Sequence, residues 1–211
     1  MYDFPAPLGT SRYEDDVYAV LARLERTTLP SRPIAFFGSS SFRLWTSMAQ
    51  DLGSLDVVNL GFGGGTNVSG LHYFDRLVLP MRPQAVVLYF GENDIANDGL
   101  TAQTSFDHLR ALRHHIRDVL PSTKVFVLST KNSPTRWIYA DEVDRYNTLT
   151  RDWCADLEDT VYVDVSSALL GENGRPAGRF YVSDFIHLNA SGYAIWAEIL
   201  QSVPDLQLAG V

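Results

Sequence analysis

The stretch Ile34-Ala35-Phe36-Phe37-Gly38-Ser39-Ser40-Ser41 is a run of four apolar residues that ends in a glycine and three serines. A continuous apolar run, in contrast to an alternating one, is typical of a strand covered on both faces, as in a parallel sheet. The small residues that follow indicate where the strand ends and a turn begins. The stretch therefore predicts a buried parallel strand with hydroxyl side chains at its carboxyl end.

Similar apolar runs recur along the chain, rich in β-branched or aromatic residues. The five runs are Ile34–Phe37, Val57–Leu60, Ala85–Phe90, Val125–Leu128 and Val161–Val165. Helical periodicity is found in Tyr13–Arg26, Phe106–Leu120 and Leu188–Leu200. Strands alternating with helices indicate an α/β domain with a parallel sheet and right-handed crossovers.

Length and composition predict one ordinary globular domain. The 211 residues contain 45% hydrophobic and 20% charged side chains, without an internal repeat or low-complexity linker. We therefore expect a single domain over residues 1–211. No apolar run approaches the roughly 20 residues of a membrane span. Because Met1–Pro5 has no basic region followed by an apolar stretch, we expect a cytoplasmic protein.

Charge and cysteine content argue against several classes of partner. The net charge of −8 and the lack of clustered Lys and Arg argue against binding to nucleic acid or to anionic membranes. The single cysteine, Cys154, lies in the stretch Asp152–Glu158, where we predict a helix and a packing role. One Cys and scattered His residues form no zinc-ligand pattern. We thus expect neither a metal nor another cofactor.

Residues after the apolar runs carry the candidate chemistry, because ligands of open parallel sheets bind beyond the carboxyl ends of the strands. The segments there are Gly38-x-Ser40, Asn59-x-Gly61-x-x-Gly64 and Gly91-x-Asn93-Asp94, and Asp184-x-x-His187 lies near the C-terminus. Acyl transfer needs a nucleophile, a base, a group that orients the base, and donors for the developing oxyanion. Together these segments supply all four.

Taken alone, each segment has a more ordinary interpretation. A serine after a strand is commonly a helix N-cap, and an asparagine there commonly bonds its own turn. The glycine-rich turn after the second run does not fit dinucleotide binding, because Thr66 stands at the third glycine position and the acidic residue about 20 positions on is missing. Phe42 likewise breaks the Gly-x-Ser-x-Gly motif of the α/β-hydrolases. The combination carries the prediction.

The four segments, in this order, resemble the blocks of the SGNH hydrolases, also called the GDSL esterase/lipase family. The resemblance spans Ile34 to Tyr193. It implies a three-layer α/β/α sandwich with a five-stranded parallel sheet, a flavodoxin-like fold. It also implies that Ser40 is the nucleophile, that His187 is the general base and acid, and that Asp184 orients His187. The backbone N–H groups of Ser40 and Gly64 and the side-chain amide of Asn93 would then form the oxyanion hole.

The first block departs from the family pattern, because Ser39 stands where an Asp is usual. In the family that Asp helps to set the turn, and a Ser hydroxyl can accept a turn hydrogen bond only more weakly. Ser39 and Ser41 are alternative nucleophiles. Ser40 is preferred because it follows Gly38 by two residues, as the motif requires.

The substrate is predicted to be a small-molecule carboxylic ester with a short acyl group, acetyl above all. Arg136 and Trp137 follow the fourth run, and either line the substrate pocket or belong to an ordinary rim loop. Five strand–helix units leave little length for a lid, and polar residues at the rim suit a sugar-like leaving group. A thioesterase or lysophospholipase, an acyltransferase and a non-catalytic binding module are the alternatives. The sequence leaves the oligomeric state open.

Overall fold

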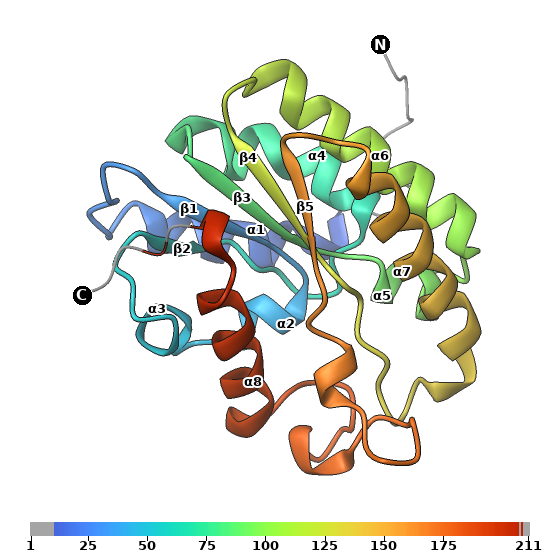
Figure 1. The fold of residues 1–211 in the computed structure, drawn as a ribbon. Helices are drawn as coiled ribbons and strands as arrows, with labels where there is room; N and C mark the ends of the chain where they lie inside the picture. Colours follow the sequence, from blue (N-terminus) through green and yellow to red (C-terminus); the bar gives the residue numbers. More distant parts are fainter. Residues whose placement is uncertain (1–10, 207, 209–211) are drawn as a thin grey trace.

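The computed structural model describes residues 11–206 and residue 208. The segment Met1–Pro5, on which the prediction of no leader rests, lies outside the described residues. The strands are β1 (Ile34–Gly38), β2 (Val57–Asn59), β3 (Ala85–Tyr89), β4 (Lys124–Leu128) and β5 (Thr160–Val163). They form one parallel sheet in the order β2-β1-β3-β4-β5 (Figure 1). The predicted five-stranded parallel sheet is confirmed, and its order is that of flavodoxin-like folds.

Helices cover both faces of this sheet (Figure 1). They are α1 (Ser11–Leu24), α2 (Ser40–Arg43), α3 (Met48–Asp51), α4 (Asn67–Leu77), α5 (Glu92–Ala96), α6 (Ala102–Val119), α7 (Ala140–Ala155) and α8 (Ala190–Gln201). Short 3₁₀ turns add η1 (Leu79–Met81), η2 (Trp137–Tyr139), η3 (Ser167–Leu169), η4 (Gly178–Phe180) and η5 (Pro204–Leu206). Side chains of α1, α4, α6 and α7 pack in one apolar cluster, and those of α3 and α8 in another. The result is the three-layer α/β/α sandwich.

Alternating strand side chains supply both apolar clusters. In β1, Ala35 and Phe37 join the cluster of α1, α4, α6 and α7, whereas Ile34 and Phe36 join the other. Successive residues of a strand point to opposite faces, so a strand buried on both faces must be apolar throughout. All five residues of β1 and of β3 are buried. This core holds the carboxyl ends of β1 and β3 side by side.

The predicted helices Tyr13–Arg26 and Leu188–Leu200 lie within two residues of α1 and α8 at each end, whereas two other helices differ more from the sequence prediction in their extent. The helix predicted from Phe106 begins at Ala102, because the side chain of Thr101 caps it by accepting a hydrogen bond from the N–H of Thr104 at 3.2 Å. The stretch predicted as helical over Asp152–Glu158 is the end of α7, which stops at Ala155. Cys154 is buried in the apolar cluster, as predicted.

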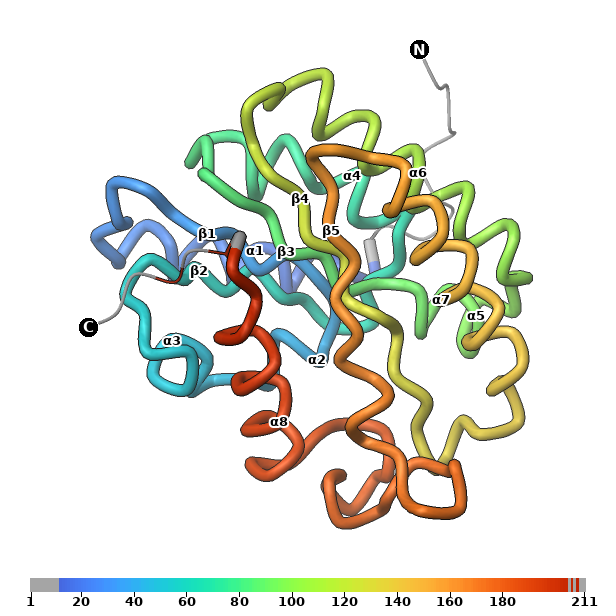
Figure 2. Tube along the Cα trace, viewed as in Figure 1, coloured from blue at the N-terminus to red at the C-terminus, as the bar shows by residue number. Residues whose placement is uncertain are grey.

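A long segment, residues 164–189, connects β5 to α8. It contains only the one-turn helices η3 and η4, and it runs past the carboxyl end of the sheet before α8 returns along the face (Figure 2). The five strand–helix units therefore use less of the chain than the sequence analysis expected, because residues 164–189 lie mostly outside regular helices and strands. Among the described residues, no helix is both long and apolar enough to cross a lipid bilayer.

Candidate active site

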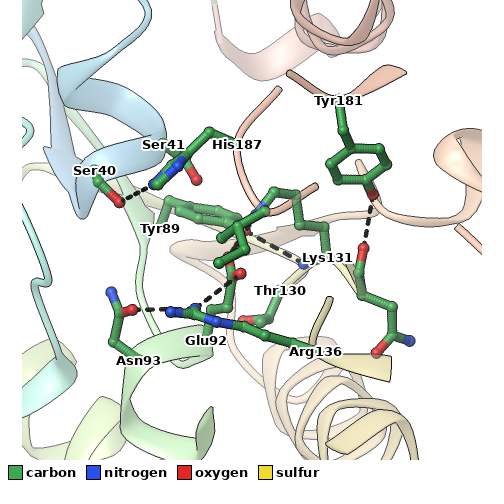
Figure 3. Close-up of polar contacts among 12 residues, drawn as sticks. Ser40, Ser41, Tyr89, Glu92, Asn93, Thr130, Lys131, Arg136, Tyr181 and His187 are labelled. Atoms are coloured by element: carbon green, nitrogen blue, oxygen red, sulfur yellow. Dashed lines mark hydrogen bonds and ion pairs between the residues drawn. The ribbon is translucent and has the colours of Figure 1, made fainter. Parts of the chain in front are cut away.

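Ser40 is the first residue of α2, directly after the turn that ends β1. Its Oγ lies 2.9 Å from Nε2 of His187 (Figure 3). Ser39 and Ser41 are only 2% and 1% exposed, whereas Ser40 is partly exposed. Of the three serines, the structure thus brings Ser40 together with the histidine. Ser39 is the N-cap residue of α2 but makes no side-chain capping bond, so the weak turn bond considered for its hydroxyl is not formed there.

Asp184 and His187 lie in a tight turn of the segment before α8. Asp184 Oδ2 lies 2.6 Å from His187 Nδ1, while its Oδ1 accepts hydrogen bonds from the backbone N–H groups of Ile186 and His187 at 2.8 and 2.9 Å. A carboxylate three residues before a histidine can therefore orient the ring and close the turn at once. The structure brings together the three residues of the predicted triad.

The charge of Asp184 determines which nitrogen of His187 carries the proton. Desolvation opposes ionisation of Asp184, but hydrogen bonds from the His187 ring and from two backbone N–H groups outweigh it and lower its pKa to about 2. The ionised carboxylate accepts only, so Nδ1 of His187 must be the donor. Nε2 is then free to accept the proton of Ser40.

The predicted oxyanion donors follow the carboxyl ends of three strands, β1, β2 and β3. Gly64, after β2, has a φ of +68°, a left-handed conformation that glycine adopts without strain. Ser40 occupies the first position of α2, where a backbone N–H has no partner inside the helix. Within residues 11–206, neither of these two N–H groups donates a hydrogen bond to another protein atom. Both therefore keep their donor capacity for a ligand.

Asn93 is the second residue of α5, directly after the turn that ends β3. Gly91, the N-cap residue of α5, has a φ of +103°, and a Cβ there would lie 2.7 Å from the ring of Tyr146. The carboxylate of Asp94 closes the turn by accepting from the N–H groups of Gly91 and Asn67. Burial raises the pKa of Asp94 to about 7, although these hydrogen bonds oppose the shift. Asn93 Nδ2 donates to the carbonyl of Gly65 at 3.0 Å, which leaves one amide hydrogen for a ligand.

A buried ionic network lies beside Asn93 (Figure 3). Glu92 Oε2 lies 2.5 Å from Lys131 Nζ, and its Oε1 lies 3.0 Å from Arg136 Nη1. Desolvation opposes ionisation of Glu92, but the positive charges of Lys131 and Arg136 outweigh it and lower the pKa of Glu92. Sequence reasoning missed Glu92 and Lys131. Both residues follow an apolar strand by three positions. A charged residue so close to the end of a buried strand is expected to be partly shielded from water, and this spacing could have indicated their role.

The polar residues that follow β3 and β4 near the site bond to other side chains of the protein. Asn97 accepts from Arg136 at 3.0 Å, Asp98 pairs with Arg12 at 3.1 Å, and Asn132 donates to Asp144 at 2.8 Å. Trp137 is half-buried, with the guanidinium of Arg175 5.4 Å from its ring centre. Substrate binding by Arg136 and Trp137 stays a prediction. In the described part of the chain, no group of three or more His, Cys, Asp or Glu side chains could hold a metal ion.

Residues 31–195 match the GDSL-like Lipase/Acylhydrolase family, and the chain belongs to that family. A comparison with curated proteins found no match. Among solved structures, a provisionally assigned acylhydrolase from Bacteroides fragilis is similar with a TM-score of 0.77 and 18% identity, over 95% of this chain and 99% of that one.

Two further solved structures support the same fold. A GDSL-like lipase from Bacteroides thetaiotaomicron has a TM-score of 0.73 and 19% identity, with 88% of this chain and 95% of that one covered. A carbohydrate esterase family 3 protein from Talaromyces cellulolyticus has a TM-score of 0.65 and 17% identity, with 81% and 94% covered.

Proposed function

We propose that this protein is a serine hydrolase of carboxylic esters. The observation that carries the proposal is the chain of hydrogen bonds from Ser40 through His187 to Asp184, with distances of 2.9 and 2.6 Å. A hydroxyl, an imidazole and an ionised carboxylate in this order form the arrangement that activates a serine for acyl transfer. Membership in the GDSL-like lipase/acylhydrolase family supports the same chemistry.

In the first half-reaction, Ser40 Oγ attacks the ester carbonyl carbon while its proton moves to His187 Nε2. The carbonyl π electrons move to the oxygen, which accepts hydrogen bonds from the N–H groups of Ser40 and Gly64 and from Asn93 Nδ2. Removal of a single donor of this kind typically costs about 2.7–4 kcal/mol of transition-state stabilisation. When the tetrahedral intermediate collapses, the bond to the alcohol oxygen breaks and the imidazolium of His187 protonates that oxygen. An acyl group then remains on Ser40.

In the second half-reaction, water takes the place of the alcohol. His187 Nε2 removes a proton from the water as it attacks the acyl carbon, and the same three donors hold the second oxyanion. Collapse breaks the bond to Ser40 Oγ, which recovers its proton from His187, and the carboxylic acid leaves. Asp184 stays ionised throughout and stabilises the imidazolium in both halves. An alcohol that displaced the water would make the protein an acyltransferase instead.

A short acyl group, acetyl above all, is the substrate that we propose. No described helix longer than eight residues lies outside the two helical layers, which leaves no helical lid to cover a long acyl chain. The polar residues around the site suit a polar or sugar-like leaving group. The similarity in fold to a carbohydrate esterase agrees with such a substrate.

Exposed apolar side chains near the site favour a second candidate, hydrolysis of longer acyl groups as in a thioesterase or lysophospholipase. Val182 and Phe185 flank Asp184 in sequence and are 40% and 47% exposed. Ile138, which is 86% exposed, lies close to the loop that bonds to this turn through the N–H of Thr135 and the carbonyl of Phe185. Each buried methylene adds about 0.8 kcal/mol, so a working acyl groove would raise kcat/KM steadily with chain length.

A series of nitrophenyl esters from acetate to decanoate tests the proposal. We expect the highest kcat/KM at acetate, and loss of activity in Ser40→Ala with an unchanged unfolding midpoint. Ser39→Ala is the matched control and should stay within about threefold of the wild type, since Ser39 does not contact His187. A maximum at octanoate or beyond would replace the acetyl proposal with the second candidate. Full activity in Ser40→Ala would overturn the proposed nucleophile, and a folded wild type inert to all esters would favour a binding module.

A further inference from the structure

Arg136 lies in the loop after β4, and its guanidinium lies beside the amide of Asn93 (Figure 3). Nη1 donates to Glu92 Oε1 at 3.0 Å and to Asn93 Oδ1 at 3.2 Å, and Nη2 donates to Asn97 Oδ1 at 3.0 Å. The side chain is only 18% exposed. Most of the donors of Arg136 are therefore used by the protein itself.

These contacts determine which way the amide of Asn93 points. Its Oδ1 accepts from Arg136 and, at 3.0 Å, from Nδ2 of Asn97, while its Nδ2 donates to the carbonyl of Gly65. A flipped amide would place NH₂ against two donors and its oxygen against a carbonyl, which breaks all three hydrogen bonds. In Figure 3 the amide nitrogen lies on the side of Ser40 and the oxygen on the side of Arg136. The donor therefore faces the nucleophile.

The charge of Arg136 is not cancelled by its neighbours. Lys131 and Glu92 are 0% and 7% exposed and lie 2.5 Å apart, and the hydroxyl of Tyr89 adds a hydrogen bond to Glu92 at 3.2 Å. Whichever atom of the Lys131–Glu92 pair holds the shared proton, the pair has no net charge. Arg136 therefore leaves one positive charge in the network. A cation that bonds the carbonyl oxygen of an amide draws electron density from its N–H groups and strengthens them as donors.

We propose that Arg136 is a positioning residue for ester hydrolysis, which acts through Asn93 by fixing the orientation of its amide and by strengthening the N–H that faces the oxyanion. Glu92 and Lys131 hold the guanidinium in place. This inference rests on the proposed function, since it assigns Asn93 to the oxyanion hole. It differs from the substrate-binding role predicted from the sequence, because the effect would fall on kcat and not on KM.

A double-mutant cycle with Arg136→Met and Asn93→Ala, assayed on nitrophenyl acetate, tests the proposal. Loss of a charged hydrogen bond that acts in the transition state should lower kcat about 10- to 30-fold in Arg136→Met, with KM within about twofold. In the Asn93→Ala background the same substitution should change kcat by less than about twofold, because its target is absent. Arg136→Lys, which keeps the charge, should recover part of the lost kcat.

Controls separate positioning from folding and from the proposed function. Arg151→Met, a matched change at an exposed arginine of α7, should leave kcat unchanged. Active-site titration with a fluorophosphonate gives the fraction of correctly folded sites, and the Arg136→Lys cycle replaces the Arg136→Met cycle if the latter variant does not fold. An equal kcat loss in both backgrounds, or a change confined to KM, would overturn the positioning role. A wild type that neither hydrolyses esters nor labels would instead overturn the proposed function.

Discussion

Replacement of Asp184 by Asn should change the protonation of His187 while the turn stays closed. The Asn oxygen can still accept from the backbone N–H groups of Ile186 and His187, as Asp184 Oδ1 does. Its NH₂ then faces His187 Nδ1 in place of the carboxylate oxygen at 2.6 Å. An NH₂ group only donates, so Nδ1 must become the acceptor and the ring proton moves to Nε2. In that tautomer His187 cannot accept the proton of Ser40.

The lost electrostatic stabilisation of the imidazolium sets the size of the effect. Asp184 is 44% exposed, so an effective dielectric constant of about 20–40 applies, and two charges about 4 Å apart then interact by roughly 2–4 kcal/mol. That energy corresponds to a decrease in kcat of about 30- to 1000-fold. His187→Ala should cost more, because it removes the base itself.

The assay is steady-state hydrolysis of nitrophenyl acetate near pH 7.5. Asp152→Asn is the matched control, because Asp152 is an exposed carboxylate that pairs with the neighbouring Arg151 at the surface. Its kcat should equal that of the wild type. If Asp184→Asn kept kcat within threefold of the wild type, the reasoning would be refuted, and another group would have to orient His187.

Two further predictions concern the turn after β3. Asn93→Ala should lower kcat by about 10²–10³-fold with a smaller change in KM, because the amide acts mainly on the transition state; a KM effect with kcat intact would contradict this role. Burial raises the pKa of Asp94 from 3.8 to about 7, so the folded state retains a proton that the unfolded chain releases near pH 4. The free energy of unfolding should therefore fall by about 2–3 kcal/mol between pH 5 and pH 8, and urea titrations of Asp94→Asn should lack this decrease. If the free energy of unfolding fell equally with pH in the wild type and in Asp94→Asn, Asp94 would be excluded as the titrating group.

Local sequence was enough to predict the sheet and to locate the candidate segments at the carboxyl ends of its strands. A strand buried on both faces must be apolar throughout, so the five apolar runs located the strands to within two residues at each end. Strand ends of a parallel sheet meet at one edge, and the resemblance to the SGNH hydrolases selected Ser40, Gly64 and Asn93 from the segments there. The pairing of Asp184 with His187 follows from their spacing within one turn. These predictions depend on short-range geometry or on sheet topology.

The network beside Asn93 could not be predicted in the same way. Arg136 reaches Glu92 and Asn97 only because the loop after β4 folds back over α5, and such a long-range contact has no periodic signal in the sequence. Lys131 follows β4 by three residues and looked like part of a surface loop, yet it is fully buried against Glu92. The start of α6 was missed because its apolar periodicity begins one turn after the cap at Thr101.

Mass spectrometry of the protein after reaction with a fluorophosphonate tests the central claim most directly. The probe reacts with a serine only where a base removes its proton and donors stabilise the resulting oxyanion-like phosphoryl oxygen. We predict one adduct per chain, mapped to Ser40 by peptide sequencing, with none in Ser40→Ala and strongly slowed labelling in His187→Ala. An adduct on Ser39 or Ser41, or a folded wild-type protein that forms no adduct, would contradict the assignment of Ser40 as the nucleophile.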